Sequence, residues 1–231
     1  MATLLYFHNS VAAPVSPNFL GTWSNTSIAS RILLATGTGG SAMTTVSFSD
    51  ADVTDQQILF RQCVSHPLTP GQTITGGQTW ALQMRVSETA TGNNLFLRRF
   101  ICVVNGNTNN KSLVLATLDN LEAATTLTNR VNGGTTQVTN YTTVSGDRLL
   151  VELGMSGDPS GGGAPSHSSS MSWGNDAGSD LPVDDTTTTA LNPWFSLTDT
   201  LTFTAEPSSD AQEWFGEYPA EKSRSPQWST Y

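Results

Sequence analysis

Alternation of apolar and polar side chains is clearest between Thr79 and Ser87. Every second residue of this run is apolar, and the apolar positions are Trp80, Leu82, Met84 and Val86. Successive side chains of a β-strand point to opposite faces of the sheet, so a period of two buries one face only. The pattern predicts a half-buried strand.

A second run, Asn94 to Val104, is mostly apolar at both odd and even positions. Such a run is typical of a central strand that is covered on both faces. It contains two adjacent arginines, Arg98 and Arg99. Because a buried charge without a partner is costly, we expect these arginines near an edge of the core, where each finds acceptors.

Seven more segments show the same strand pattern, which gives about nine strands in all. Segments rich in Gly or Asn separate them and supply the positive-φ positions that tight turns need, so we expect mainly hairpin connections. The additional predicted strands are Thr3 to His8, Met43 to Ser49, Gln57 to Ser65, Ser112 to Leu118, Thr136 to Thr143, Arg148 to Gly154 and Leu197 to Ala205.

Helical periodicity is confined to Leu118 to Leu127, where an Asp119-Asn120 pair can cap one short helix. The segment Ser156 to Asp180 is rich in Gly, Ser and Pro, and its pattern predicts a long surface loop. Many short strands and almost no helix predict an all-β fold, either a jelly roll or a related antiparallel β-sandwich.

The chain divides at residue 205. Residues 1–205 are predicted to form the β-sandwich, whereas residues 206–231 lose the strand alternation and form an extended C-terminal arm. The arm is polar and contains prolines, yet it carries five aromatic residues, and these are our predicted interface residues: Trp214, Phe215, Tyr218, Trp228 and Tyr231.

Two positions for this arm remain open. The arm can lie across a neighbouring subunit, which we favour, or it can plug the end of its own sandwich. Aromatic side chains suit both positions, because each buries a large apolar area.

Charge and composition narrow the possible functions. The 231 residues include ten Lys and Arg against nineteen Asp and Glu, which gives a formal net charge of −9. The basic residues are scattered and cannot neutralise a run of phosphates, which excludes nucleic acid as a partner. No apolar run approaches the ~20 residues of a membrane helix, and the N-terminus lacks the pattern of a signal peptide. We therefore expect a soluble protein, made in a cytoplasm, that does not bind membranes.

Residues with catalytic or metal-binding chemistry are present but do not form a recognised pattern. Glu88 and Glu152 are the glutamates in or beside strands, and they do not stand out as a pair of catalytic carboxylates. The histidines lie far apart in the sequence, which argues against a metal triad or a Ser-His-Asp site; they are His8, His66 and His167. We predict no enzymatic activity and no cofactor.

Three further features have two interpretations each. The acidic positions Asp176, Asp180, Asp184 and Asp185 could bind calcium, but a solvated loop fits their spacing better. Cys63 and Cys102 could face one another across a sheet, although two buried, reduced thiols are favoured. The six tryptophans would suit a carbohydrate-binding module, but apolar neighbours place Trp23, Trp80 and Trp194 in the core.

Several segments together resemble virion structural proteins of tailed bacteriophages. These segments are Ser65-His66-Pro67-Leu68, Gly76-Gly77-Gln78-Thr79-Trp80, Leu97 to Val103, Gly146 to Gly154, Asp180 to Asp185 and Asn192-Pro193-Trp194-Phe195. The resemblance covers roughly residues 3 to 204 and includes no catalytic motif. It implies a jelly roll or related β-sandwich that is built into a virus particle.

Within that class the resemblance implies two roles. A capsid cement or decoration protein binds the outside of the head, and its partners are the major capsid protein and copies of itself. A tail- or baseplate-associated module instead binds host-surface glycan. The modest length, the lack of a fibre repeat and the aromatic arm favour the cement protein at the capsid surface.

Overall fold

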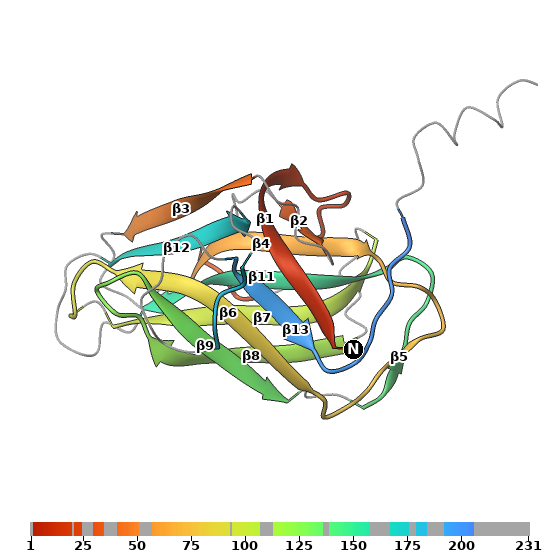
Figure 1. The fold of residues 1–231 in the computed structure, drawn as a ribbon. Helices are drawn as coiled ribbons and strands as arrows, with labels where there is room; N and C mark the ends of the chain where they lie inside the picture. Colours follow the sequence, from red (N-terminus) through yellow and green to blue (C-terminus); the bar gives the residue numbers. More distant parts are fainter. Residues whose placement is uncertain are drawn as a thin grey trace, which may run out of the picture.

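The fold was obtained as a computed structural model. It describes residues 2–19, 21–24, 30–34, 41–50, 57–92, 94–106, 113–135, 139–157, 167–175, 179–183 and 192–205. These residues form β-strands, turns and extended segments and no helix, which confirms the all-β prediction (Figure 1). No helix long and apolar enough to cross a membrane occurs among them.

Eleven strands form one curled sheet, and two short strands pair separately. The sheet contains β1 (Thr3–Ala12), β2 (Ser30–Leu34), β3 (Ser41–Asp50), β4 (Gln57–Pro67), β6 (Thr79–Glu88), β7 (Leu95–Asn105), β8 (Leu113–Glu122), β9 (Thr128–Thr135), β11 (Asp147–Gly157), β12 (His167–Asn175) and β13 (Trp194–Leu197). The separate pair consists of β5 (Thr73–Ile74) and β10 (Tyr141–Thr142).

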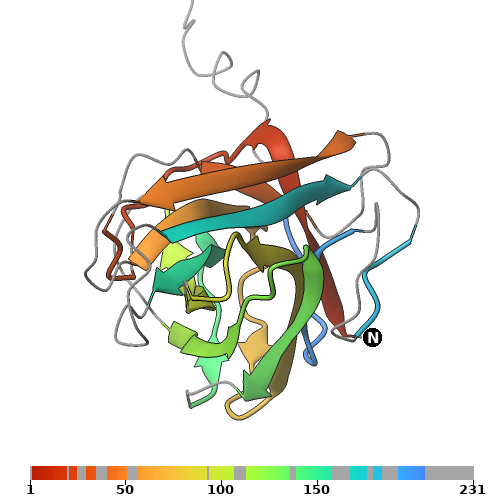
Figure 2. The ribbon, with the colours of Figure 1, turned by 90° about the vertical axis from the view of Figure 1, so that its left-hand side faces the viewer.

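The main sheet runs in the order β3-β12-β6-β13-β1-β2-β4-β11-β7-β8, and β9 pairs with the other edge of β6. β2 and β4 are parallel neighbours, whereas the other strand pairs of the described segments are antiparallel. The curl brings β8 and β9 close together (Figure 1). Figure 2 shows β3 and β12 side by side along one side of the body.

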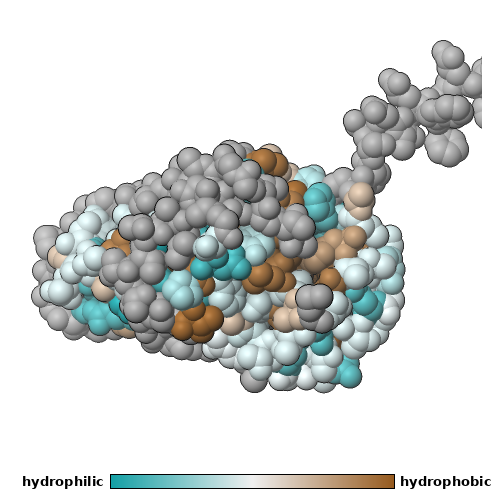
Figure 3. All heavy atoms as spheres, viewed as in Figure 1, coloured by the Kyte–Doolittle hydropathy of each residue, from teal (hydrophilic) through white to brown (hydrophobic). Residues whose placement is uncertain are grey.

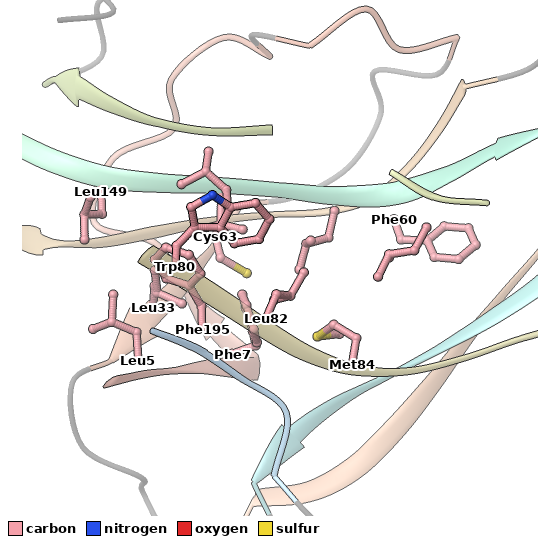
Figure 4. Packing of buried hydrophobic residues seen from close by; sticks show 14 of the residues in the cluster. Leu5, Phe7, Leu33, Phe60, Cys63, Trp80, Leu82, Met84, Leu149 and Phe195 are labelled. Atoms are coloured by element: carbon pink, nitrogen blue, oxygen red, sulfur yellow. The ribbon is translucent and has the colours of Figure 1, made fainter. Parts of the chain in front are cut away.

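The core lies inside this curl. The alternating residues of β6 point inward as the sequence pattern predicts, and Trp80, Leu82 and Met84 pack against Phe7 and Phe195 (Figure 4). Burial of these side chains stabilises the curled sheet because it removes apolar surface from water. On the outside, hydrophobic atoms occur in small groups among polar ones on the face that Figure 3 shows.

The sheet also buries part of its outer face. A second apolar cluster contains Val64, Phe100, Cys102, Val104 and Leu150. Residues 13–19 and 21–24, which we name the N-terminal strap, run over it and pack Ala13 and Val15 against it. This explains why β7 is apolar on both faces: one face meets the core and the other meets the strap.

Three of the predicted elements are wrong and one is incomplete. Of the predicted strand Leu197 to Ala205, Leu197 alone belongs to a strand, as the end of β13, and Phe203 forms an isolated bridge to Leu68. The segment Leu118 to Leu127 contains the end of β8 and no helix, because pairing with β7 overrides the local helical pattern. The predicted loop Ser156 to Asp180 contains β12, which pairs with β3 and β6. Of the predicted strand Thr136 to Thr143, β10 covers Tyr141 and Thr142, and residues 136–138 lie outside the described part.

The cysteines do not face one another. Cys63 belongs to the inner cluster and Cys102 to the outer one, so the sheet separates them, and both are free and buried. Burial raises the pKa of the Cys63 thiol to about 12, although Arg61 and Arg31 partly oppose this shift. Two buried, reduced thiols are therefore the correct interpretation of this pair.

Candidate interaction site at the root of the C-terminal arm

A pocket of about 440 Å³ opens where residues 201–205 run beside the end of β4. We name it the arm-root pocket. Three segments form its walls: the loop after β4, the turn before β11 and the end of the described chain. Its lining residues are Pro67, Leu68, Pro70, Ser145, Gly146, Arg148, Thr204 and Ala205.

The first wall is the loop from Pro67 to Gln72, which Thr143 holds in place. The Thr143 hydroxyl donates a hydrogen bond to the Thr69 carbonyl at 2.8 Å. The Gly71 amide donates to the Thr143 carbonyl at 2.8 Å, and the Thr143 amide donates to the Gln72 carbonyl at 2.9 Å. Gly71 has a φ of 85°, a conformation that glycine adopts readily. The hydrogen bonds to Thr143 therefore fix the first wall.

The second wall is the turn that enters β11, and the buried carboxylate of Asp147 organises it. Asp147 Oδ2 accepts hydrogen bonds from the Tyr141 hydroxyl at 2.6 Å and the Val144 amide at 2.8 Å. Asp147 Oδ1 accepts one from Asn105 Nδ2 at 3.0 Å. Gly146, with a φ of 88°, completes the turn. The sequence predicted this turn but not the carboxylate that holds it.

The third wall is the segment that leads to the arm. Thr69 N donates to the Thr202 carbonyl at 2.9 Å, and Thr204 N donates to the Pro67 carbonyl at 2.8 Å. The Gln72 amide group pairs with Thr202 through two bonds of 2.8 and 2.9 Å. In Figure 1 this segment is the blue trace that passes β5 and ends at the margin of the body.

Asp199 secures the same segment closer to β13. Its Oδ2 accepts hydrogen bonds from the Thr75 amide and from Gln78 Nε2, both at 2.6 Å. Its carbonyl accepts bonds from the amide and the hydroxyl of Thr3 at 3.0 and 2.6 Å. The chain is thus bonded to the body at intervals from Asp199 to Thr204.

The chemistry of the pocket suits binding. Among its eight lining residues there is no histidine, cysteine or carboxylate, and the one charged residue is Arg148. Arg148 Nη1 donates a hydrogen bond to the Ser65 carbonyl at 3.0 Å, which fixes the guanidinium. The half-buried Pro67 and the exposed Pro70 provide apolar surface beside this positive charge, whereas Leu68 is fully buried. Such a pocket accommodates an apolar or aromatic group with an acidic neighbour.

The predicted interface residues themselves lie outside the described part of the chain: Trp214, Phe215, Tyr218, Trp228 and Tyr231. The pocket-lining residues were not predicted. Their turns were visible in the sequence as Pro- and Gly-containing segments, but nothing in the sequence indicated that two turns and residues 204–205 meet.

The two candidate glutamates have separate structural roles. Glu152 Oε2 accepts bonds from Gly21 N at 2.8 Å and Trp23 Nε1 at 2.7 Å, which hold the strap on the sheet. Glu88, at the end of β6, accepts a bond from Leu95 N at 3.1 Å. Burial raises the pKa of Glu88 and the charge of Glu122 adds to this, whereas the bond from Leu95 opposes it.

The three histidines lie on three different strands, β1, β4 and β12. His8 Nδ1 accepts a bond from Val11 N at 3.1 Å, and burial together with Arg31 and Arg61 lowers the pKa of His8. No group of three His, Cys, Asp or Glu side chains suited to a metal occurs in the described residues.

Of the four acidic positions that were considered for calcium, Asp180 is described and accepts a bond from the Tyr6 hydroxyl at 3.1 Å. This contact and burial raise the pKa of Tyr6 to about 12, with burial the larger cause. Asp176, Asp184 and Asp185 lie outside the described part.

The described tryptophans offer little open ring surface for a sugar. Trp80, Trp173 and Trp194 are buried. Trp23 is half-buried rather than in the core, and the Arg98 guanidinium lies 5.5 Å from its ring centre. The neighbouring Arg99 points into the core, 4.5 Å from the Trp80 ring, and not to an edge as predicted. The position over an aromatic face favours this cation.

No family model matches this chain, and no curated protein matches it. Similar solved structures include infectious bursal disease virus of the Gx strain, at 16% identity over 81% of this chain and a TM-score of 0.21. The Gt strain structure has 10% identity over 92% of this chain and a TM-score of 0.22. The VP2 subviral particle of the same virus has 12% identity over 82% and a TM-score of 0.21.

This chain spans 41, 65 and 45% of the length of those three chains. All three are structures of a virus or of a virus-derived particle. At these TM-scores the likeness carries no argument about function, which is inferred below from this chain's own residues.

Proposed function

We propose that this chain is a non-enzymatic structural protein of a virus particle, and more specifically a cement protein on the outside of the capsid. One observation carries the proposal. A rigid β body fixes its chain by hydrogen bonds as far as Thr204, and an arm with five aromatic residues begins next to a preformed apolar pocket. This arrangement suits a protein that attaches to other protein subunits.

The physical requirements of a cement protein agree with this arrangement. A specific protein interface buries about 1,000 Å² or more, and its binding energy is concentrated in a few aromatic or arginine residues. An arm with five aromatic side chains supplies such residues. The net charge of −9 also opposes contact with a packaged genome and favours an outer position.

The hydrogen bonds that three carboxylates accept support a structural role. Asp147, Glu152 and Asp199 each accept several hydrogen bonds that tie loops to the body. These carboxylates stabilise connections and do not face the pocket as acid and base. The proposed partners are the major capsid protein and further copies of this chain.

The alternative, a glycan-binding module of the tail or baseplate, has less support. Sugar recognition by stacking needs an open aromatic face, and Arg98 lies against the ring of the half-buried Trp23. The other described tryptophans are buried.

The test compares virus particles that carry this protein with particles that lack it. Labelled antibody should mark the head, and particles without the protein should release their genome at a lower temperature. Addition of the purified chain should restore heat resistance, whereas a chain with its five arm aromatics replaced by Ser should not. Label on the tail, or equal heat resistance with and without the protein, would contradict the proposal.

A further inference from the structure

The arm-root pocket and the start of the arm belong to the same surface patch. Ala205 lines the pocket, and the 26 residues of the arm follow it directly. A patch that contains both an extension and a receptor for an extension is self-complementary under a twofold axis. Two copies can therefore exchange arms at this patch and form a closed dimer.

The path of the described chain favours exchange over return to the same pocket. Thr204 is bonded to Pro67, so the chain is held in an extended path up to the margin of the body. The first aromatic residue of the arm, Trp214, follows after eight residues. For Trp214 to enter the pocket of its own copy, these eight residues would have to reverse direction. The arm reaches the pocket of a second copy across the twofold axis without such a reversal.

The charges of the two parts are complementary. Residues 206–221 contain five acidic residues and no Lys or Arg. The acidic residues are Glu206, Asp210, Glu213, Glu217 and Glu221. The one charged residue of the pocket lining is Arg148. Glu213 directly precedes Trp214, so this pair presents a carboxylate beside an indole ring, which matches an apolar pocket with a cationic wall.

We infer that the chain forms a twofold dimer in which Trp214 of each copy occupies the arm-root pocket of the other copy. The inference rests on the proposed function, in that it takes the arm to bind other subunits, and it adds the identity of one such subunit and of its receptor. The apolar surface of Pro67 and Pro70 takes the indole, and Arg148 provides the favourable charge for Glu213.

The first experiment measures the mass of the purified full chain in solution by light scattering. The expected mass is twice the chain mass of 24.6 kDa. Ser145→Trp fills the pocket from an exposed turn position, and Trp214→Ala removes its occupant. Each should weaken the dimer by about 30-fold or more, as expected when a central interface residue is lost.

The matched control is Val183→Trp, because Val183 is 65% exposed and lies outside the pocket lining. It should leave the dimer unchanged. If Ser145→Trp fails to fold, Ala205→Trp fills the same pocket from another wall. A monomeric wild-type chain, or a dimer that tolerates a folded pocket-filling variant, would overturn the inference.

A second experiment distinguishes exchange from self-contact. A Ser145→Cys chain and a Trp214→Cys chain of different tag size are mixed, unfolded, refolded together and oxidised. Exchange predicts a disulfide-linked band that contains both tags, since Cys63 and Cys102 are buried in the folded chain. A chain that carries both substitutions and closes a disulfide within a monomer, with no mixed band, would overturn the inference.

These results separate the inference from the proposed function. A monomeric wild-type chain that still protects particles against heat overturns the dimer and leaves the cement role intact. A dimer with exchanged arms whose absence leaves particles equally heat-resistant supports the dimer and contradicts the cement role.

Discussion

Three carboxylates hold connections to the β body: Asp147 and Glu152, which are buried, and Asp199, which is half-buried. Glu152 shows how many connections one residue can make. Its two oxygens accept bonds from the Gly21 amide, the Trp23 indole and Gln62 Nε2, the last at 3.1 Å. Gln62 also accepts a hydrogen bond from Ser30 and donates to the Pro17 carbonyl at 3.3 Å. Glu152 therefore connects the strap to β4 and β11.

Glu152→Gln should destabilise the folded chain by about 2 kcal/mol, because it replaces charge-assisted bonds and places an amide donor among donors. Trp23→Phe removes one of the three donors and keeps the ring, so its loss should be smaller, about 1 kcal/mol. Urea unfolding of both variants measures these losses. Equal stability of Glu152→Gln and wild type would show that the strap does not depend on this carboxylate.

The raised pKa of Glu88 predicts that the stability of the folded chain depends on pH. Because burial raises its pKa in the folded state above the ordinary 4.5, its contribution to stability is fully present below about pH 4.5 and is lost as the pH rises through the folded-state pKa. Glu88→Gln keeps an acceptor for the Leu95 amide and has no charge. It should raise the Tm at pH 7 and have little effect at pH 4. A lower Tm at pH 7 would contradict this sign.

At the scale of elements, the close approach of β11, β4 and the strap depends on one glycine. A Cβ atom at Gly154 would lie 1.9 Å from the Ile58 carbonyl oxygen and 2.8 Å from the Trp23 ring. The register of β4 against β11 shifts between Leu153 and Gly154, so the chain already bends here. No side chain fits unless the backbone of β4 moves.

Gly154→Ala should therefore destabilise the chain by about 2 kcal/mol or more, in the range of overpacked cores. Gly92→Ala is the matched control, because nothing lies within 4 Å of a Cβ built at Gly92. It should change stability by less than about 0.5 kcal/mol. Thermal unfolding of the two variants compares them directly, and equal losses would contradict the packing described for Gly154.

The accuracy of the sequence predictions also differs between elements. Alternation predicted β6 closely, and an apolar run on both faces predicted β7. In both strands the apolar positions themselves identify the faces that are buried. The alternation pattern did not predict β12, because the serines of this segment are typical of a loop. The position of β12 depends instead on its pairing with β3 and β6. The helix predicted near Leu118 failed for the same reason, since distant pairing overrides local pattern.

At the scale of the whole molecule, the sequence predicted an all-β body followed by an arm, and the all-β fold is confirmed. The arm-root pocket was beyond prediction, because its walls come from residues near 67, 145 and 204, which only the folded topology brings together. Among the described residues, the inner cluster contains members from Leu5 to Leu201. In this account the body folds without the arm, and the arm serves assembly.

Removal of residues 206–231 tests this account most directly, with the Tm and the mass in solution measured for the shortened and the full chain. We predict a Tm within about 2 °C of the full chain, equivalent to less than about 1 kcal/mol for a domain of this size, together with loss of assembly. A shortened chain that still assembles, or one that unfolds far below the full chain, would contradict the account, because the arm would then be part of its own body.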